Sequence, residues 1–99
     1  MKDVFLVHIK LPEIFTSEFY DLIPKQRMLI NDLLEKRVVL SYSLDMERKN
    51  LWVFFEAKNR EDLNSVLNLF PIIKNVKVTV HELAFYDTAP LLMPDPIMN

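Results

Sequence analysis

Hydrophobic and polar positions along this 99-residue chain follow two different periods. Residues 3–11, 38–44, 51–57 and 76–86 alternate, which is typical of β-strands, because successive side chains of a strand point to opposite faces. The stretches 16–36 and 59–70 place apolar residues at helical spacing. The resulting order, β-α-β-β-α-β, predicts an α+β fold: a ferredoxin-like sandwich with an antiparallel sheet.

Capping residues indicate where the two helices begin. Thr16 or Ser17 precedes the first and Asn59 precedes the second, each followed by acidic residues that favour the helix dipole. Pro24 lies inside the first helical pattern, so either a short helix ends near Leu22 and a second begins at Pro24, or one helix kinks there. The apolar stripe predicted for this region consists of Leu22, Ile23, Met28, Leu29, Leu33 and Leu34.

Both faces of the predicted sheet carry apolar residues. The face expected under the helices holds Phe5, Val7, Val53, Phe55, Val78 and Val80. The opposite face holds Leu6, His8, Val39, Ser41, Ser43, Trp52, Phe54, Glu56, Thr79 and His81. This second face is too apolar to meet water and too polar for a dry core. We therefore expect a homodimer in which two sheets pack face to face around a partly polar cavity.

Composition supports association and excludes several classes of function. Hydrophobic residues make up 51% of the chain, more than one small sheet and two helices need to cover a single face, and exposed patches of this size mark interfaces. The net charge of −2, without a basic run, argues against a nucleic-acid partner. The chain has no Cys and no Gly, which excludes disulfide frameworks, thiol nucleophiles and glycine-rich phosphate loops. Without Gly, tight turns are expected to use Asn, Asp and Pro.

The two ends of the chain differ in character. The first residues, MKDVFLVHIKLPE, contain an apolar run too short and too interrupted for a signal peptide or membrane span, so we expect a cytoplasmic protein without a membrane partner. We predict one ferredoxin-like domain over residues 1–87. Residues 88–99 hold three of the six prolines among apolar residues. They are expected to form an extended arm on a neighbouring subunit, and the alternative is a disordered end.

Several short segments of the sequence are similar to those of a known family. Residues 5–11 (FLVHIKL) lead into Pro12, and Leu69-Phe70-Pro71 precedes the last strand, after a helix with spaced leucines at Leu63 and Leu67. In these segments, which are spread over about residues 5–83, the chain resembles the muconolactone isomerases. The resemblance implies a dimeric α+β barrel that assembles into rings. It also implies a cofactor-free proton shift on a small lactone or organic acid.

The polar residues of that family are replaced in this chain. Its acidic positions on the first helix correspond here to Gln26, Arg27 and Met28. Its second strand has a Trp-Arg-His-like run followed by another Trp-Arg, and the same places here are Val39, Leu40, Ser41, Ser43 and Leu44. The sequence therefore predicts a divergent member, and no catalytic residue is carried over. The open alternatives are a cofactor-independent isomerase-like enzyme, a non-catalytic protein that binds a small apolar ligand, and a structural assembly partner.

Three titratable residues share the second face of the predicted sheet. His8, Glu56 and His81 are the candidate catalytic residues, since a histidine beside a carboxylate in an enclosed cavity acts as a general base. The alternative is that each is a half-buried polar residue satisfied by hydrogen bonds. No local motif supports a metal site, and we expect no cofactor.

The same face provides candidate ligand-binding residues. Trp52 and Phe54 would form an aromatic wall that stacks on a planar ligand, or else pack in an interface core. The remaining candidates on this face are Ser41, Ser43 and Thr79.

Overall fold

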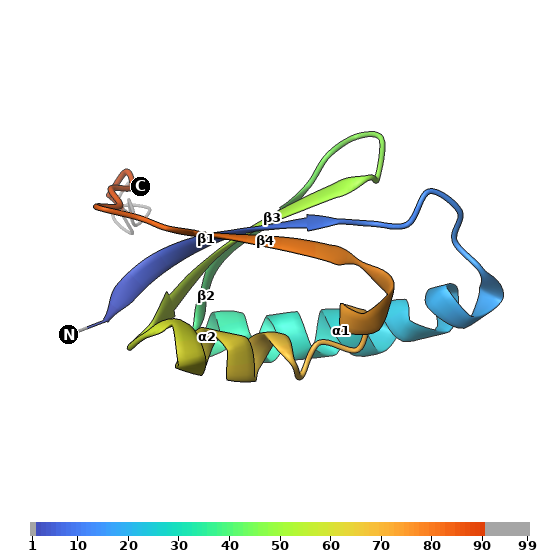
Figure 1. Cartoon of the computed structure of the whole chain (residues 1–99), viewed down its shortest axis with the longest axis horizontal. Coiled ribbons are helices and arrows are strands. Elements are labelled where there is room, and N and C mark those ends of the chain that lie inside the picture. Colours follow the sequence, from blue (N-terminus) through green and yellow to red (C-terminus); the bar gives the residue numbers. More distant parts are fainter. Residues whose placement is uncertain (1, 91–99) are drawn as a thin grey trace, which may run out of the picture.

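The computed structural model describes residues 2–90. Its elements are β1 (Asp3–Lys10), α1 (Ser17–Glu35), β2 (Val39–Leu44), β3 (Asn50–Ala57), α2 (Arg60–Leu67), the 3-10 turn η1 (Ile73–Asn75) and β4 (Lys77–Glu82). The four strands form one antiparallel sheet in the order β2-β3-β1-β4, and both helices lie on one side of it (Figure 1). The predicted ferredoxin-like α+β fold is confirmed. Of the predicted arm, residues 91–99 lie outside the described part of the chain.

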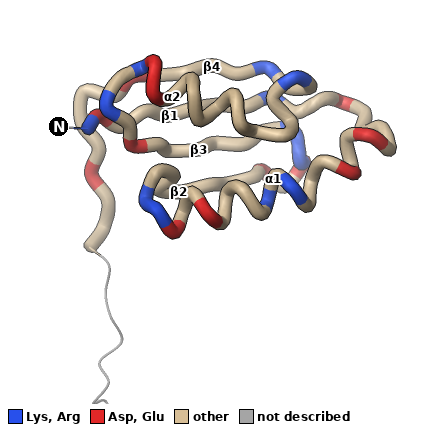
Figure 2. The backbone as a smooth tube through the Cα atoms, turned by 90° about the horizontal axis from the view of Figure 1, so that it is seen from below, with Lys and Arg blue, Asp and Glu red and all other residues tan. Residues whose placement is uncertain are grey.

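The hydrophobic core lies between the sheet and the helices. Phe5, Val7 and Ile9 of β1 and Val53 and Phe55 of β3 are at most 1% exposed. Each such side chain contributes about 1.5–3 kcal/mol when it leaves water. Figure 2 shows the two helices side by side across this face, with α1 near β2. The prediction of which sheet face the helices cover is therefore confirmed for these residues.

Helix α1 is one continuous helix. Thr16 is its N-cap, and its Oγ1 accepts a hydrogen bond of 3.2 Å from the backbone nitrogen of Phe19. Pro24 lies within it, so the first of the two alternatives, a break before Pro24, is not adopted. The predicted apolar stripe is wrong at Met28 and Leu34, which are 73% and 39% exposed. The helix is rotated so that the buried positions are Phe19, Gln26, Ile30 and Leu33.

Helix α2 begins and packs as predicted. Asn59 Oδ1 accepts a hydrogen bond of 2.9 Å from the backbone nitrogen of Asp62, which caps the first turn. Leu63 and Leu67 are buried against the sheet, and Phe70 follows them into the core. Within residues 2–90, neither helix combines the length and the hydrophobicity that crossing a bilayer requires.

A β-bulge changes the side of the sheet to which some residues of β2 point. Val39 pairs with Phe55, but Ser41 pairs with Phe54, so Leu40 is an additional residue on this strand. The extra residue places Val39 in the core, where it is 1% exposed. The prediction that Val39 faces away from the helices is therefore wrong. Strand β4 also ends earlier than expected, at Glu82 rather than near Tyr86.

Arginines occupy the left-handed backbone positions of this glycine-free chain. Arg37 and Arg48 have φ values of 60° and 58°. The turn before β3 also uses Asp45, whose Oδ1 accepts hydrogen bonds from the backbone nitrogens of Lys49 and Asn50 at 2.8 and 3.1 Å. The expectation that Asn, Asp and Pro form the tight turns holds for Asp45 and is wrong for the two positive-φ positions.

Candidate functional site

All the candidate site residues lie on the side of the sheet away from the helices, the open face. In one row across the strands, Ser43, Trp52, His8 and Thr79 follow one another. In the next row, Ser41, Phe54, Leu6 and His81 do the same. Glu56 lies in a third row, opposite Val4. The open face is therefore an ordered array of aromatic, imidazole and hydroxyl side chains.

The structure separates the three candidate catalytic residues. His8 and His81 are diagonal neighbours on β1 and β4, a relationship that places residues about 7–8 Å apart. Glu56 pairs with Val4, which lies four positions from His8 on β1, or about 13 Å at about 3.3 Å per residue. Glu56 is therefore not beside His8. Among residues 2–90, no three His, Cys, Asp or Glu side chains are arranged to hold a metal ion.

His8 has different partners from those expected. Its Nε2 lies 2.7 Å from Asn50 Oδ1, and the Asn50 Nδ2 donates a hydrogen bond of 2.9 Å to Asp45 Oδ2. The Asn50 side chain, followed by the Lys49 backbone N–H, lowers the pKa of Asp45 below its ordinary value, so Asp45 is a carboxylate at neutral pH. The imidazole also stacks on Trp52, with ring centroids 5.6 Å apart and an interplanar angle of 25°.

A cavity of about 330 Å³ lies on the opposite side of the sheet, against α1. We call it the α1 cavity. Its apolar walls come from Leu11, Phe15, Phe19, Ile23, Leu44, Leu51 and Ile72. Its polar lining residues are Gln26, Arg27, Tyr42 and Arg48. Apolar walls with a few convergent polar groups are the usual composition of small-molecule sites.

Gln26 is the buried polar residue at the base of the α1 cavity. It is 4% exposed, and its Oε1 accepts a hydrogen bond of 3.4 Å from the backbone nitrogen of Ile72. Its Nε2 has no hydrogen-bond partner among the described residues. Buried amides are normally paired, because an unpaired one costs about 1–3 kcal/mol. Nε2 is therefore an unsatisfied donor on a residue that lines the cavity.

Tyr42 provides a second donor in the α1 cavity. Burial raises the pKa of its phenol, and the Arg27 guanidinium and Gln26 amide oppose this rise without cancelling it. The Gln26 amide lies close enough to the phenol to lower its pKa, although its Nε2 does not meet the distance and angle limits of a hydrogen bond within residues 2–90. Tyr42 is consequently protonated at neutral pH and able to donate.

Two arginines give the α1 cavity a positive charge. Arg27 on α1 and Arg48 in the turn before β3 both line it. Across residues 2–90, the one ion pair is Lys36 with Asp32, so neither arginine is neutralised by a carboxylate of that part of the chain. None of the residues lining the cavity is acidic. The cavity therefore favours an anion.

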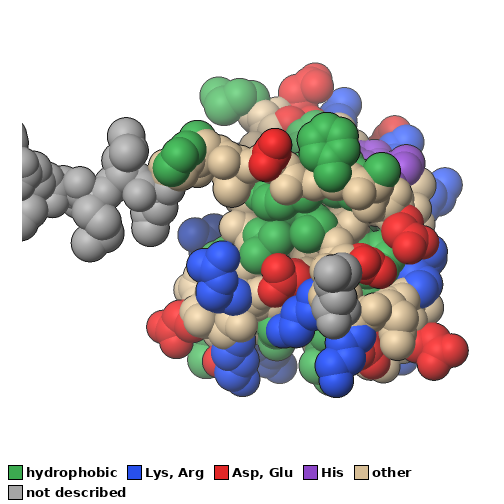
Figure 3. Space-filling view, turned by 90° about the vertical axis from the view of Figure 1, so that its left-hand side faces the viewer, with side chains coloured by type: hydrophobic (Ala, Val, Ile, Leu, Met, Phe, Trp, Pro, Cys, Tyr) green, Lys and Arg blue, Asp and Glu red, His purple; other side chains and the backbone are tan. Residues whose placement is uncertain are grey.

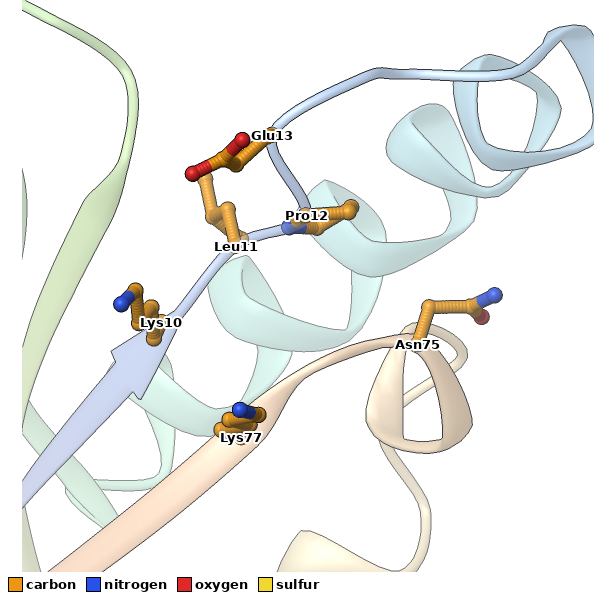
Figure 4. A pocket seen from close by; sticks show the side chains of 6 residues that line it. All are labelled: Lys10, Leu11, Pro12, Glu13, Asn75 and Lys77. Atoms are coloured by element: carbon orange, nitrogen blue, oxygen red, sulfur yellow. The ribbon is translucent and has the colours of Figure 1, made fainter.

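A third feature is a shallow hollow of about 290 Å³ at the end of β1 (Figure 4). It is lined by Lys10, Leu11, Pro12, Glu13, Asn75 and Lys77. Lys10 and Lys77 are cross-strand partners, so two like charges stand side by side at this corner of the open face. Its polar lining residues are all exposed, whereas the α1 cavity also contains the buried amide of Gln26, so this hollow is the weaker binding site.

Reasoning from sequence missed the α1 cavity, although one signal was present. Phe19, Ile23, Gln26, Ile30 and Leu33 have helical spacing, and Gln26 is the polar residue within this apolar series. A polar side chain on the buried stripe of a helix indicates either a packing partner or a ligand. Tyr42 and Arg48 line the cavity because of the bulge in β2 and the turn before β3. No sequence motif indicates the bulge or the conformation of the turn.

Comparisons with known proteins support the fold but assign the chain to no family. No protein-family model matches the chain, and no curated protein matches it. Among solved structures, it is similar to a conserved protein of unknown function from Bacteroides thetaiotaomicron, described as a possible oxidoreductase. The TM-score is 0.51 and the identity 14%, over 85% of this chain and 97% of that one. At this identity, the likeness supports the ferredoxin-like α+β fold and assigns no activity.

Proposed function

We propose that this protein binds a small organic acid with an apolar body in the α1 cavity. The observation that carries the proposal is the unpaired Nε2 of Gln26, an amide that is 4% exposed and lies among mostly apolar lining residues. A volume of about 330 Å³ lies in the range of about 300–1,000 Å³ typical of ligand pockets. The proposal agrees with the organic acids or lactones that the resemblance to muconolactone isomerases implies.

The polar residues suggest how such an acid would be held. Arg27 and Arg48 would pair with the carboxylate, because charge-assisted hydrogen bonds from guanidinium groups are among the stronger ones. Gln26 and Tyr42 would donate to a carbonyl or to a second carboxylate oxygen. The ring of Phe19 and the side chain of Ile23 would cover the apolar body.

Binding is better supported at this cavity than turnover. An isomerase-like proton shift needs a group that accepts a proton, and the lining residues include no carboxylate and no imidazole. Tyr42 is kept neutral by its raised pKa, so it is a donor rather than a base. The cofactor-independent isomerase remains the second candidate function. It is favoured by one observation, the oriented imidazole of His8 on the open face.

We also propose that two copies of the chain pack through their open faces. Leu6 and Phe54 are half-buried there, Trp52 is 37% exposed, and the ring of Tyr86 lies 5.0 Å from that of Phe54. Phe85, the residue before Tyr86, is 81% exposed. Figure 3 views the molecule from the end near the N-terminus, where hydrophobic side chains gather among charged ones. A second copy would remove the apolar side chains of the open face from water and would enclose its polar ones, His8 among them, in a cavity between the two sheets.

Binding to the α1 cavity is tested by titrating the protein with benzoate and following backbone amide NMR shifts. We expect shifts concentrated at Phe19, Ile23 and Tyr42. The double variant Arg27→Gln/Arg48→Gln should bind benzoate at least about tenfold more weakly, since a charge-assisted hydrogen bond contributes about 1.5–3 kcal/mol. Arg60→Gln, on α2 outside the cavity, is the matched control and should bind normally. Shifts confined to other surfaces, or equal affinity in the double variant, would contradict the proposal.

A further inference from the structure

We propose that Asp45, Asn50 and His8 form a proton-accepting site on the open face for a small ring that carries an acidic hydroxyl, of the phenol class. This site lies on the other side of the sheet from the α1 cavity, so it does not depend on the organic-acid proposal. It also differs from the expected pairing of His8 with Glu56 or His81, because the partners of His8 come from the turn before β3 and from its first residue.

The hydrogen-bond chain determines which nitrogen of His8 carries the proton. An ionised carboxylate only accepts hydrogen bonds, so Asp45 Oδ2 requires the NH₂ group of Asn50 at 2.9 Å. The carbonyl oxygen of Asn50 must then face His8, and it too only accepts. Nε2 of His8, at 2.7 Å from this oxygen, is therefore the protonated nitrogen. In the neutral ring, Nδ1 is left with a free lone pair.

That lone pair is available to a ligand. Nδ1 forms no hydrogen bond within residues 2–90, and it is not among the buried unpartnered atoms of this part of the chain, so solvent reaches it. A carboxylate that holds an imidazole through its other nitrogen fixes the tautomer and stabilises the cation formed when the ring accepts a proton. Here Asp45 acts indirectly, through the side-chain amide of Asn50.

The surroundings of His8 indicate the class of ligand. Trp52, stacked on the imidazole and 37% exposed, offers an aromatic surface for a planar ring. Thr79 is the cross-strand partner of His8 on the other side and carries a hydroxyl. Lys10 and Lys77 stand in the adjacent row of the same face and would stabilise a developing negative charge. A planar ring with an acidic hydroxyl satisfies all three features.

The proton transfer balances within this group. The O–H bond of the ligand breaks, its electron pair stays on the oxygen as a phenolate, and the proton forms a new N–H bond at Nδ1. The resulting imidazolium keeps its Nε2–H on Asn50 Oδ1. No oxidant, reductant or second substrate takes part. His8 is the residue that touches the ligand, whereas Asn50 and Asp45 are positioning residues.

Two measurements on the full chain test the proposal. Nitrogen NMR of the imidazole should show His8 as the Nε2–H tautomer, and Asn50→Ala should convert it to a mixture of tautomers.

Para-nitrophenol, whose phenolate absorbs visible light, should show a stronger phenolate band with the wild-type protein than in buffer. His8→Gln should weaken its binding tenfold or more. The glutamine NH₂ group still donates to Asn50, but its carbonyl oxygen is too weak a base to take the proton. Lys36→Gln, at the exposed end of α1, should not change it.

The outcomes separate a chemical role from a structural one. Circular dichroism should show His8→Gln to be folded, which makes loss of the phenolate band attributable to Nδ1. A wild-type His8 in the Nδ1–H tautomer would overturn the proposal. So would unchanged para-nitrophenol binding in His8→Gln, or binding in Asn50→Ala equal to that of the wild type while the tautomers are mixed.

Discussion

Gln26 Oε1 on α1 lies 3.4 Å from the backbone nitrogen of Ile72, which precedes η1, while the Nε2 of the same amide is unpaired among residues 2–90. One half of this buried side chain thus contributes a long hydrogen bond, and the other half carries a desolvation cost of about 1–3 kcal/mol. We predict that Gln26→Met changes the free energy of unfolding of the free protein by less than about 1 kcal/mol. The substitution removes the cost of the unpaired Nε2, but it leaves the buried backbone N–H of Ile72 without its acceptor, a cost of similar size. Met and Gln have similar helix propensities.

Urea unfolding of the two proteins measures this difference. The same substitution should weaken benzoate binding, so binding is expected to fall while stability hardly changes. Destabilisation by more than about 1 kcal/mol would show instead that Nε2 is satisfied in the folded protein.

The second prediction concerns Tyr42 and alkaline pH. Burial raises the folded-state pKa of this phenol above its ordinary value of 10.0. Above about pH 10 the unfolded chain releases the proton while the folded protein keeps it, so the unfolded state binds fewer protons and stability falls as pH rises. The contribution of the neutral phenol is fully present below the unfolded pKa and is lost as pH rises through the folded pKa.

Tyr42→Phe should therefore lose less stability than the wild type between about pH 8 and about pH 11. Urea unfolding across this range measures the difference, in which the titration of lysines common to both proteins cancels. Tyr20→Phe is the matched control, because Tyr20 is 59% exposed on α1. Parallel pH profiles for wild type and Tyr42→Phe would contradict the prediction.

The fold was predictable because its signals are local. The alternation in β1 and β3 and the Asn59 cap of α2 were readable, since each is determined by residues within one element. The rotation of α1 was not. Which of its apolar residues meet the sheet depends on tertiary packing, and Met28 remained exposed. The bulge at Leu40 reversed the facing of Val39, because one inserted residue changes the parity of a strand.

The candidate site was predictable only in part, for the same reason. The two-residue period of a strand correctly placed His8 and Trp52 on the open face, because the side to which a residue points follows from its position within its own strand. It could not give the distance between His8 and Glu56, which depends on register. The link from His8 to Asn50 and Asp45 joins a strand to a turn that residue patterns do not specify in three dimensions. The α1 cavity likewise combines α1, β2 and the turn before β3.

The third prediction concerns self-association. We expect the wild-type protein to sediment as a dimer or a larger assembly, and Leu6→Glu to sediment as a folded monomer. Leu6 lies in the middle of the open face, between Phe54 and His81, so a carboxylate there would be costly to bury between two sheets and harmless in a monomer.

Sedimentation velocity with circular dichroism measures both properties. Leu69→Glu provides the control, since Leu69 is 63% exposed and lies after α2, away from the open face. It should leave the assembly unchanged. A monomeric wild-type protein, or an assembly disrupted equally by Leu69→Glu, would rule out association through the open face.

The last prediction concerns the C-terminus of α1, where Arg37 has a φ of 60°. The backbone nitrogen of Arg37 donates to Leu34 O at 3.1 Å and that of Val38 to Leu33 O at 2.9 Å. This is the Schellman pattern, in which glycine is the preferred residue at the left-handed position. A side chain with Cβ costs about 1–2 kcal/mol there, and the greater freedom of glycine in the unfolded chain offsets about 0.4–1 kcal/mol. We therefore expect Arg37→Gly to stabilise the protein by about 0.5–1 kcal/mol in urea unfolding. Arg37→Ala removes the same charge but keeps Cβ, so equal stabilisation by alanine would show that backbone strain is not the cause.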